Sequence, residues 1–186
     1  MMAMRPDAKA LLLHAPIEGY LRSIAKKEMW GRIWVRDVLI GTAKDGYLVG
    51  SFSTEELLKL TDLQVAALGW LSQHKLYAQI AEKFGPDRVR IIDSDTFLAN
   101  QKPVLRRLAQ FFDIDLTAGQ IDAIITGPAF TTHSKDAVAF DADLRRDEQA
   151  TLASLHGAEI DMVAKWAIAV AENQEIDLEP ATALLR

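Results

Sequence analysis

Two short apolar runs, each followed by a helical pattern, are the clearest local feature of the chain. The first covers residues 9–13 and ends at 14–16 in His-Ala-Pro. Proline fixes its own φ and disfavours helix for the residue before it, so this run is predicted to be a buried strand that ends in a turn. The second run, 88–92, is rich in β-branched residues and stops at the polar residues 93–95. It predicts a second strand.

Helical spacing accounts for most of the remaining chain. Capping boxes, in which Ser or Thr precedes Glu or Gln by three residues, begin at Ser53, Thr61 and Thr117. The first two predict helices over about 54–60 and 62–84, and the third predicts a short helix. Further helices are predicted after Pro16, over 30–45, after Pro103 and over about 142–172, the last with an interruption near 156–157.

This inventory predicts a helix-rich α/β protein. Two strand–helix units separated by a long helical crossover are typical of a parallel layout, so the strands are expected to be parallel and adjacent or nearly so. A two-stranded parallel sheet is marginal by itself. Either the helices dominate the fold, or other strands lie in sequence outside this chain. On the second interpretation, residues 1–186 are a single domain that is incomplete at its N-terminus.

Composition narrows the class of protein. The chain is 49% apolar and 25% charged, as in ordinary globular proteins. Its net charge of −5 argues against a protein that coats nucleic acid, although a local basic pocket for one small anion remains compatible. The absence of cysteine excludes disulfides, thiolate zinc sites and cysteine nucleophiles. Because no apolar run is long enough for a membrane span and no secretory signal is recognisable, we expect a soluble cytoplasmic protein.

Several patterns that often carry chemistry are weak in this chain. Residues 41–46 have the glycine spacing of a phosphate loop but lack the Lys and Ser/Thr that must follow it. The histidines are widely separated without metal-ligand spacing, so His74 and His156 are expected to pack or to lie on the surface, and no metal is expected. The helical spacing of the four tryptophans predicts core packing. The basic residues of two helices fit a solvated helix face or the edge of an anion site: Arg22, Lys26, Lys27, Arg32 and Arg36.

His14 and Ser23 form the best candidate site. In open α/β sheets, ligands collect at the carboxyl ends of strands, near the next helix N-terminus. His14 lies at such an end, and Ser23 lies about two turns into the following helix. A side chain that can carry positive charge and a hydroxyl could together hold a phosphate there. The alternative is a turn residue and a helix-surface serine.

Residues 6–16, followed by Ser23, resemble the 3′-phosphate-binding segment of sulfotransferases, which read P-x-A-K, an apolar strand, R-x-P and a helix bearing Ser. Residues 90–112 resemble a second landmark of that family, in which a strand ends in an acidic turn and leads into a helix that begins with Pro and carries spaced Leu and Phe. The polar loop at 133–135 lies where related bacterial proteins close over the nucleotide. The resemblance covers about residues 6–172.

The chain departs from this family in three places. His14 replaces an Arg, so that a permanent charge gives way to one that titrates near neutrality. The spacing from His14 to Ser23 is one residue longer, which rotates Ser23 by about 100° and puts Arg22 in the expected register. The family's phosphate loop, with its lysine, and the usual catalytic base precede the segment with which this chain opens.

The resemblance implies a partial three-layer fold of the P-loop type with few parallel strands. It implies transfer of a sulfuryl group from 3′-phosphoadenosine 5′-phosphosulfate to a hydroxyl or amine, without a metal, by a protein that is truncated or degenerate. On one side of the nucleotide, His14, Arg22 and Ser23 are expected to line the site, joined by Ser134 and Lys135 from the later loop. Two alternatives stay open: a non-enzymatic interaction module that uses the helices over 62–84 and 142–172, and a hydrolase that uses His133 with Asp136.

Overall fold

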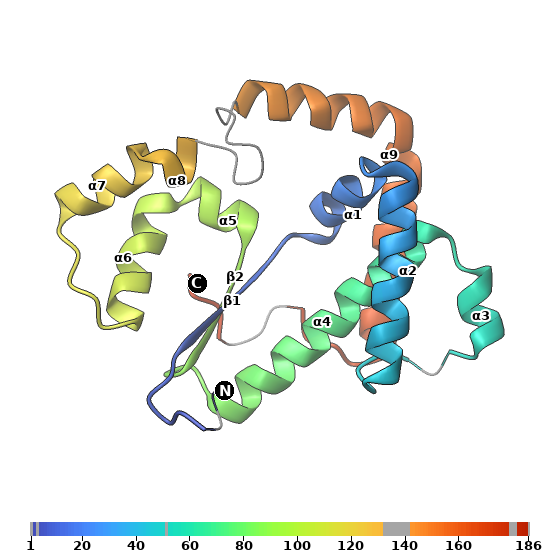
Figure 1. Ribbon diagram of the computed structural model, residues 1–186, viewed down its shortest axis with the longest axis horizontal. Coiled ribbons are helices and arrows are strands. Elements are labelled where there is room, and N and C mark those ends of the chain that lie inside the picture. The colour runs from blue at the N-terminus through green and yellow to red at the C-terminus, as the bar shows by residue number, and fades with distance from the viewer. Residues whose placement is uncertain (1, 3, 51, 132–141, 179–181, 186) are drawn as a thin grey trace.

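The two predicted strands are present and lie side by side in a computed structural model of the chain (Figure 1). Strand β1 (Ala10–His14) and strand β2 (Val89–Asp93) pair in parallel. Their register runs from Ala10 opposite Val89 to His14 opposite Asp93. The prediction of two adjacent parallel strands in a helix-rich α/β protein is therefore confirmed.

The structure describes residues 2, 4–50, 52–131, 142–178 and 182–185, with the backbone alone at 28, 54, 129 and 142–155. Helices make up most of these residues. Their bounds are α1 (Ile17–Ala25), α2 (Glu28–Lys44), α3 (Thr54–Lys59), α4 (Asp62–Phe84), α5 (Ser94–Ala99), α6 (Gln101–Phe111), α7 (Ala118–Thr126), α8 (Pro128–Thr131) and α9 (Ala142–Asn173). The three capping boxes predicted at Ser53, Thr61 and Thr117 are all formed.

Side chains of the sheet alternate between two helical layers, as the period of a strand requires. On one face, Leu12 and Ile91 pack with residues of the second half of α4. On the other face, Leu11 and Ile92 pack with residues of α5 and α6. The sheet is thus covered by helix on both faces, and His14, two residues after Leu12, is on the α4 side.

A larger apolar cluster joins α1, α2, α4 and α9 beside the sheet (Figure 1). Leu21 and Ile24 of α1 are buried there together with residues of the first half of α4. Helix α4 therefore belongs to both parts of the molecule, since its first half fills this cluster and its second half covers the sheet. Its position fixes where β1 ends.

The structure differs from the sequence-based expectations in several places. Helix α9 runs unbroken through residues 156–157, although Figure 1 shows it changing direction partway along. Helix α6 begins two residues before Pro103, which fits within a first turn because that turn needs no N–H. Residues 94–99 form the unpredicted helix α5, and the C-terminal segment pairs unexpectedly with β2, since the N–H of Leu184 donates to the carbonyl oxygen of Ile91 at 2.8 Å.

A further correction concerns the tryptophans. Trp70 is buried in the cluster and Trp166 packs against it. Trp30 and Trp34 on α2 are instead 74% and 48% exposed. The prediction that all four tryptophans lie in the core is wrong for this pair, because α2 is apolar on its outer face as well as on its inner one. Among the described helices, none has both the length and the apolar character that a membrane span demands.

Candidate functional site at the carboxyl edge of the sheet

The carboxyl ends of β1 and β2 bring His14 and Asp93 to the same edge of the sheet. The two residues are opposite each other in the parallel register. Helix α1 starts three residues after His14, and α5 starts directly after Asp93. This edge is where open α/β sheets place their ligands.

His14 is held at this edge by a histidine of α4. Nδ1 of His14 lies 3.2 Å from Nε2 of His74 and 3.4 Å from the carbonyl oxygen of Ala15. The two imidazole rings meet edge to face, with their centroids 4.5 Å apart. Within the described residues, Nε2 of His14 makes no hydrogen bond, and His14 itself is only partly buried.

Trp70 organises this pair of histidines. Its carbonyl oxygen lies 2.9 Å from Nδ1 of His74, and its indole stacks on the His74 ring with the centroids 3.6 Å apart. Its indole N–H donates to the carbonyl oxygen of Ala15 at 2.8 Å. One turn further along α4, the hydroxyl of Tyr77 donates to the carbonyl oxygen of Leu13 at 3.4 Å. Helix α4 therefore fixes the end of β1 through side chains at the spacing i, i+4 and i+7.

His74 and Asp93, the two titratable residues beside His14, have different electrostatic environments. Burial lowers the pKa of His74 from 6.5 to about 4, so this imidazole is neutral near pH 7. Burial opposes ionisation of Asp93, but hydrogen bonds from Thr96 and the positive charge available at His14 bring the pKa of this carboxyl below its ordinary value. The edge therefore holds one carboxylate, one neutral imidazole and one imidazole nitrogen, Nε2 of His14, that has no hydrogen-bond partner among the described residues.

The other predicted residues on α1 lie further from this edge. Arg22 is half-exposed and pairs with Glu18 one turn earlier, at 3.6 Å. Ser23 is exposed. It follows Ile17 by six residues, which places it about 9 Å along the helix axis from that start. Among the described residues, no hydrogen bond or ion pair joins His14, Arg22 and Ser23 to one another. Ser134 and Lys135, like His133 and Asp136, lie outside the described residues.

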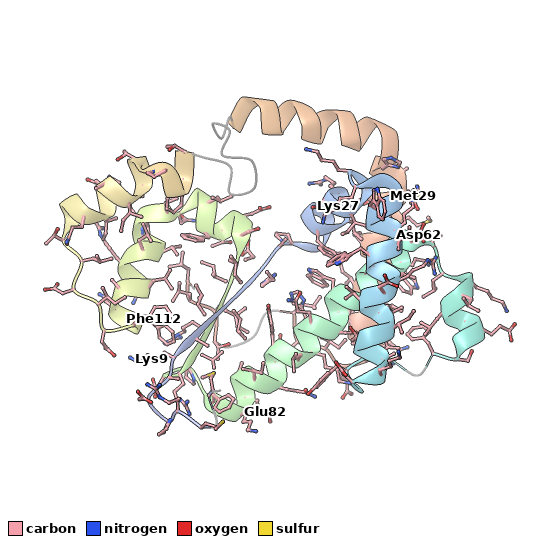
Figure 2. All side chains as sticks on the ribbon, in the orientation of Figure 1. Lys9, Lys27, Met29, Asp62, Glu82 and Phe112 are labelled. Atoms are coloured by element: carbon pink, nitrogen blue, oxygen red, sulfur yellow. The ribbon has the colours of Figure 1, made fainter. Side chains whose placement is uncertain are left out.

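A second polar place in the molecule involves two of the basic residues singled out in the sequence. A cavity of about 190 Å³ is lined by side chains of α1, α2, α4 and α9, including Arg32, Arg36 and His156. Asp62 also lines this cavity, and Figure 2 shows it beside α2. Nε of Arg36 donates to Oδ1 of Asp62 at 2.8 Å, and Arg32 approaches Oδ2 at 3.6 Å. Because Glu159 lines the cavity together with Asp62, two carboxylates balance the formal charge of the two guanidinium groups.

Of the two helices proposed for a partner surface, the described part of α9 exposes the apolar side chains Met162 and Ile168, fewer than α2 exposes. Ten residues of α4 are buried, which leaves little of its apolar surface for a partner. Helix α2 instead exposes seven apolar side chains at or just beyond its ends and along its outer face: Met29, Trp30, Ile33, Trp34, Val38, Ile40 and Tyr47.

Sequence reasoning missed His74 and Trp70, which were expected to pack. The available signal was the spacing Trp70, His74, Tyr77, since polar tips at i, i+4 and i+7 share one face of a helix. Within the part of the chain that the structure describes, no three His, Asp or Glu side chains form a group that could hold a metal ion. Comparison of the chain with protein-family models, with curated proteins and with solved structures finds no match.

Proposed function

We propose that the chain binds the 3′-phosphate of an adenine nucleotide at the carboxyl edge of β1 and belongs to a sulfotransferase-like group. The observation that carries the proposal is the position of His14. It ends a parallel strand, it precedes a helix, and its Nε2 atom has no partner among the described residues. A nitrogen in that position can donate to a phosphate oxygen when the imidazole is protonated.

The donor set fits a phosphate only in part within the described residues. His14 supplies one donor at the edge of the sheet. The exposed pair of Arg22 with Glu18 is weak enough for the guanidinium to exchange its carboxylate for a phosphate, because such pairs contribute little. Ser23, Ser134 and Lys135 complete the proposed set. In this proposal the bound 3′-phosphoadenosine 5′-phosphosulfate supplies the transferable sulfuryl group, and this chain's residues hold its nucleotide.

The layering of the fold also supports the proposal. Helices cover both faces of a parallel sheet, which is the arrangement of three-layer nucleotide-binding folds. We extend the coarse α/β description to a partial P-loop-type fold on this basis and on the resemblance of residues 6–16 and 90–112.

Titration calorimetry with two nucleotides tests the proposal. Wild type is expected to bind 3′-phosphoadenosine 5′-phosphate about tenfold more tightly than adenosine 5′-phosphate, which lacks the 3′-phosphate, because a charge-assisted hydrogen bond contributes about that factor. His14→Ala is expected to reduce the difference, with the other proposed donors holding what remains, and His14→Arg to keep it at alkaline pH. His156→Ala, a half-buried histidine in the separate cavity, is the matched control. Equal binding of the two nucleotides by wild type would refute the proposal.

A second candidate function is a non-enzymatic interaction module. The exposed apolar face of α2 favours it, because patches of this kind often mark protein contacts. The occupant we consider is a second copy of the chain. Sedimentation equilibrium of wild type and of the variant Trp30→Ser/Trp34→Ser distinguishes the two functions, since only the module predicts association that both substitutions abolish.

A further inference from the structure

We propose that His74 is a positioning residue that occupies the Nδ1 proton of His14 and thereby reserves His14 Nε2 for a ligand. The ligand in this inference rests on the proposed function. Which ring nitrogens of His14 and His74 carry protons does not depend on the proposed function, and this can be measured without any nucleotide.

The direction of each hydrogen bond follows from a carbonyl group. The main-chain oxygen of Trp70 can only accept, so Nδ1 of His74, 2.9 Å away, must carry a proton. A neutral imidazole has one N–H, which leaves Nε2 of His74 as a lone-pair acceptor. Nδ1 of His14, 3.2 Å from that acceptor, must then be the donor.

The opposite direction is disfavoured by burial. If Nε2 of His74 donated to His14, both nitrogens of His74 would carry protons and the ring would be a buried cation. His74 is only 4% exposed, and its low pKa has burial as the largest cause. Among the described residues, no acidic side chain pairs with His74 to offset this cost, and the positive charge that His14 can carry also disfavours a proton on His74. His14 therefore donates to His74, and His74 donates to the carbonyl oxygen of Trp70.

The surroundings hold both rings in this arrangement. The His74 ring is stacked on the Trp70 indole, with an angle of 32° between the planes. The His14 ring stands nearly perpendicular to the His74 ring, at 79°. Tyr77 lies beyond His74 on α4, with a centroid distance of 6.2 Å, and Asp93 lies across the sheet from His14.

The consequence for binding concerns a single atom. Nδ1 of His14 carries its proton whether the ring is neutral or charged. Any proton that His14 gains or loses is therefore on Nε2, the atom that lacks a partner among the described residues. His14 can donate to a phosphate without losing its bond to His74, because the two nitrogens serve different partners.

Nitrogen-15 NMR of the histidine side chains in the full chain tests the arrangement of protons. In wild type at alkaline pH, neutral His14 is expected to carry its proton on Nδ1. His74→Gln is expected to keep this tautomer, because Oε1 of glutamine is as many bonds from the backbone as Nε2 of histidine and also accepts. His74→Leu leaves only the more distant carbonyl oxygen of Ala15, which already accepts from Trp70, and is expected to give a mixture of tautomers. Wild-type His14 with its proton on Nε2, or an unchanged tautomer in His74→Leu, would overturn the inference.

Nucleotide binding gives the second readout. His74→Leu is expected to weaken binding of 3′-phosphoadenosine 5′-phosphate about tenfold, the usual effect of losing one hydrogen bond, and His74→Gln by less than about threefold. Equal affinities of His74→Leu and wild type would overturn the positioning role. If wild type does not bind this nucleotide, the proposed function fails, and the NMR spectra still decide the role of His74. The spectrum of His74→Gln keeps that decision possible if His74→Leu does not fold.

Discussion

The ends of the two strands differ in how their last residues are used. Asp93 at the end of β2 begins the next helix, since its Oδ1 accepts a hydrogen bond from the N–H of Thr96 at 2.8 Å and caps α5. His14 at the end of β1 caps nothing, because α1 begins after Pro16 without a side-chain cap. It is held from the side by His74 instead. Asp93 is therefore used to cap a helix, whereas His14 keeps its Nε2 atom available for a ligand.

This difference indicates where an anion can approach the edge of the sheet. The carboxylate of Asp93 repels a phosphate, and its capping bond holds it in the ionised form. Nε2 of His14 is the atom of the pair that can donate to an anion.

The largest effect is expected from Trp70, which supports the end of β1. Trp70→Ala removes a buried indole, and we expect a loss of about 3–5 kcal/mol in the free energy of unfolding. Trp70→Phe keeps most of the packing but removes the N–H that donates to Ala15, which should cost about 1–2 kcal/mol. Urea unfolding followed by far-ultraviolet circular dichroism measures both. A cost below about 0.5 kcal/mol for both variants would mean that Trp70 does not support this strand end.

A pH dependence of stability is expected from His74. In the unfolded chain its pKa is 6.5, and in the folded protein it is about 4. Between these two pKa values the unfolded state binds the proton more readily than the folded state does. The free energy of unfolding therefore decreases as the pH falls below 6.5 and increases as the pH is raised toward 6.5. This difference in pKa is expected to lower the free energy of unfolding by about 2 kcal/mol between pH 7 and pH 5. Urea unfolding at the two pH values measures it.

His74→Gln isolates this contribution, because glutamine does not titrate. We expect the stability of this variant to change by less than about 0.5 kcal/mol over the same interval. The folded pKa of Asp93 is lowered, so its contribution is lost only as pH falls past 3.8 toward that value, below the interval measured. Equal losses in wild type and His74→Gln would contradict a neutral, buried His74.

The fold could be predicted well where local signals agreed. The proline after His14 and the β-branched run before Asp93 identified both strands, and the three capping boxes identified the starts of α3, α4 and α7. The prediction was wrong at Trp30 and Trp34, because helical spacing shows that residues share a face and does not show whether another element covers it. The pairing of residues near the C-terminus with β2 could not be predicted either, since it is a contact between residues more than 90 positions apart.

The candidate site could be predicted only in part. The position of His14 follows from the strand that ends there. Its partner is 60 residues away in the sequence, and the contact depends on how α4 crosses the sheet, which the pattern of a single helix does not specify. Burial of His74 likewise depends on this crossing, so its low pKa was not foreseeable from the residue type.

An intermediate effect is expected at the other strand end. Asp93→Ala removes the cap of α5 and should lower the free energy of unfolding by about 1 kcal/mol. Asp93→Asn keeps a capping oxygen and should cost only a few tenths of a kcal/mol. Because Asn carries no charge, we also expect this variant to bind 3′-phosphoadenosine 5′-phosphate more tightly than wild type. Unfolding and calorimetry on the two variants separate the roles, and weaker binding by Asp93→Asn would show that the carboxylate does not oppose the phosphate.

The smallest effect on stability is expected at Arg22, and it decides the register of α1. Its pair with Glu18 is exposed, so Arg22→Ala should change the free energy of unfolding by less than about 0.5 kcal/mol. Consecutive residues of a helix point about 100° apart, so Arg22 and Ser23 cannot both face the end of β1 in the same way. If Arg22 has taken the place that serine holds in sulfotransferases, Arg22→Ala weakens binding of 3′-phosphoadenosine 5′-phosphate and Ser23→Ala does not. Calorimetry on the two single variants distinguishes the registers, and the reverse order of effects would assign the contact to Ser23.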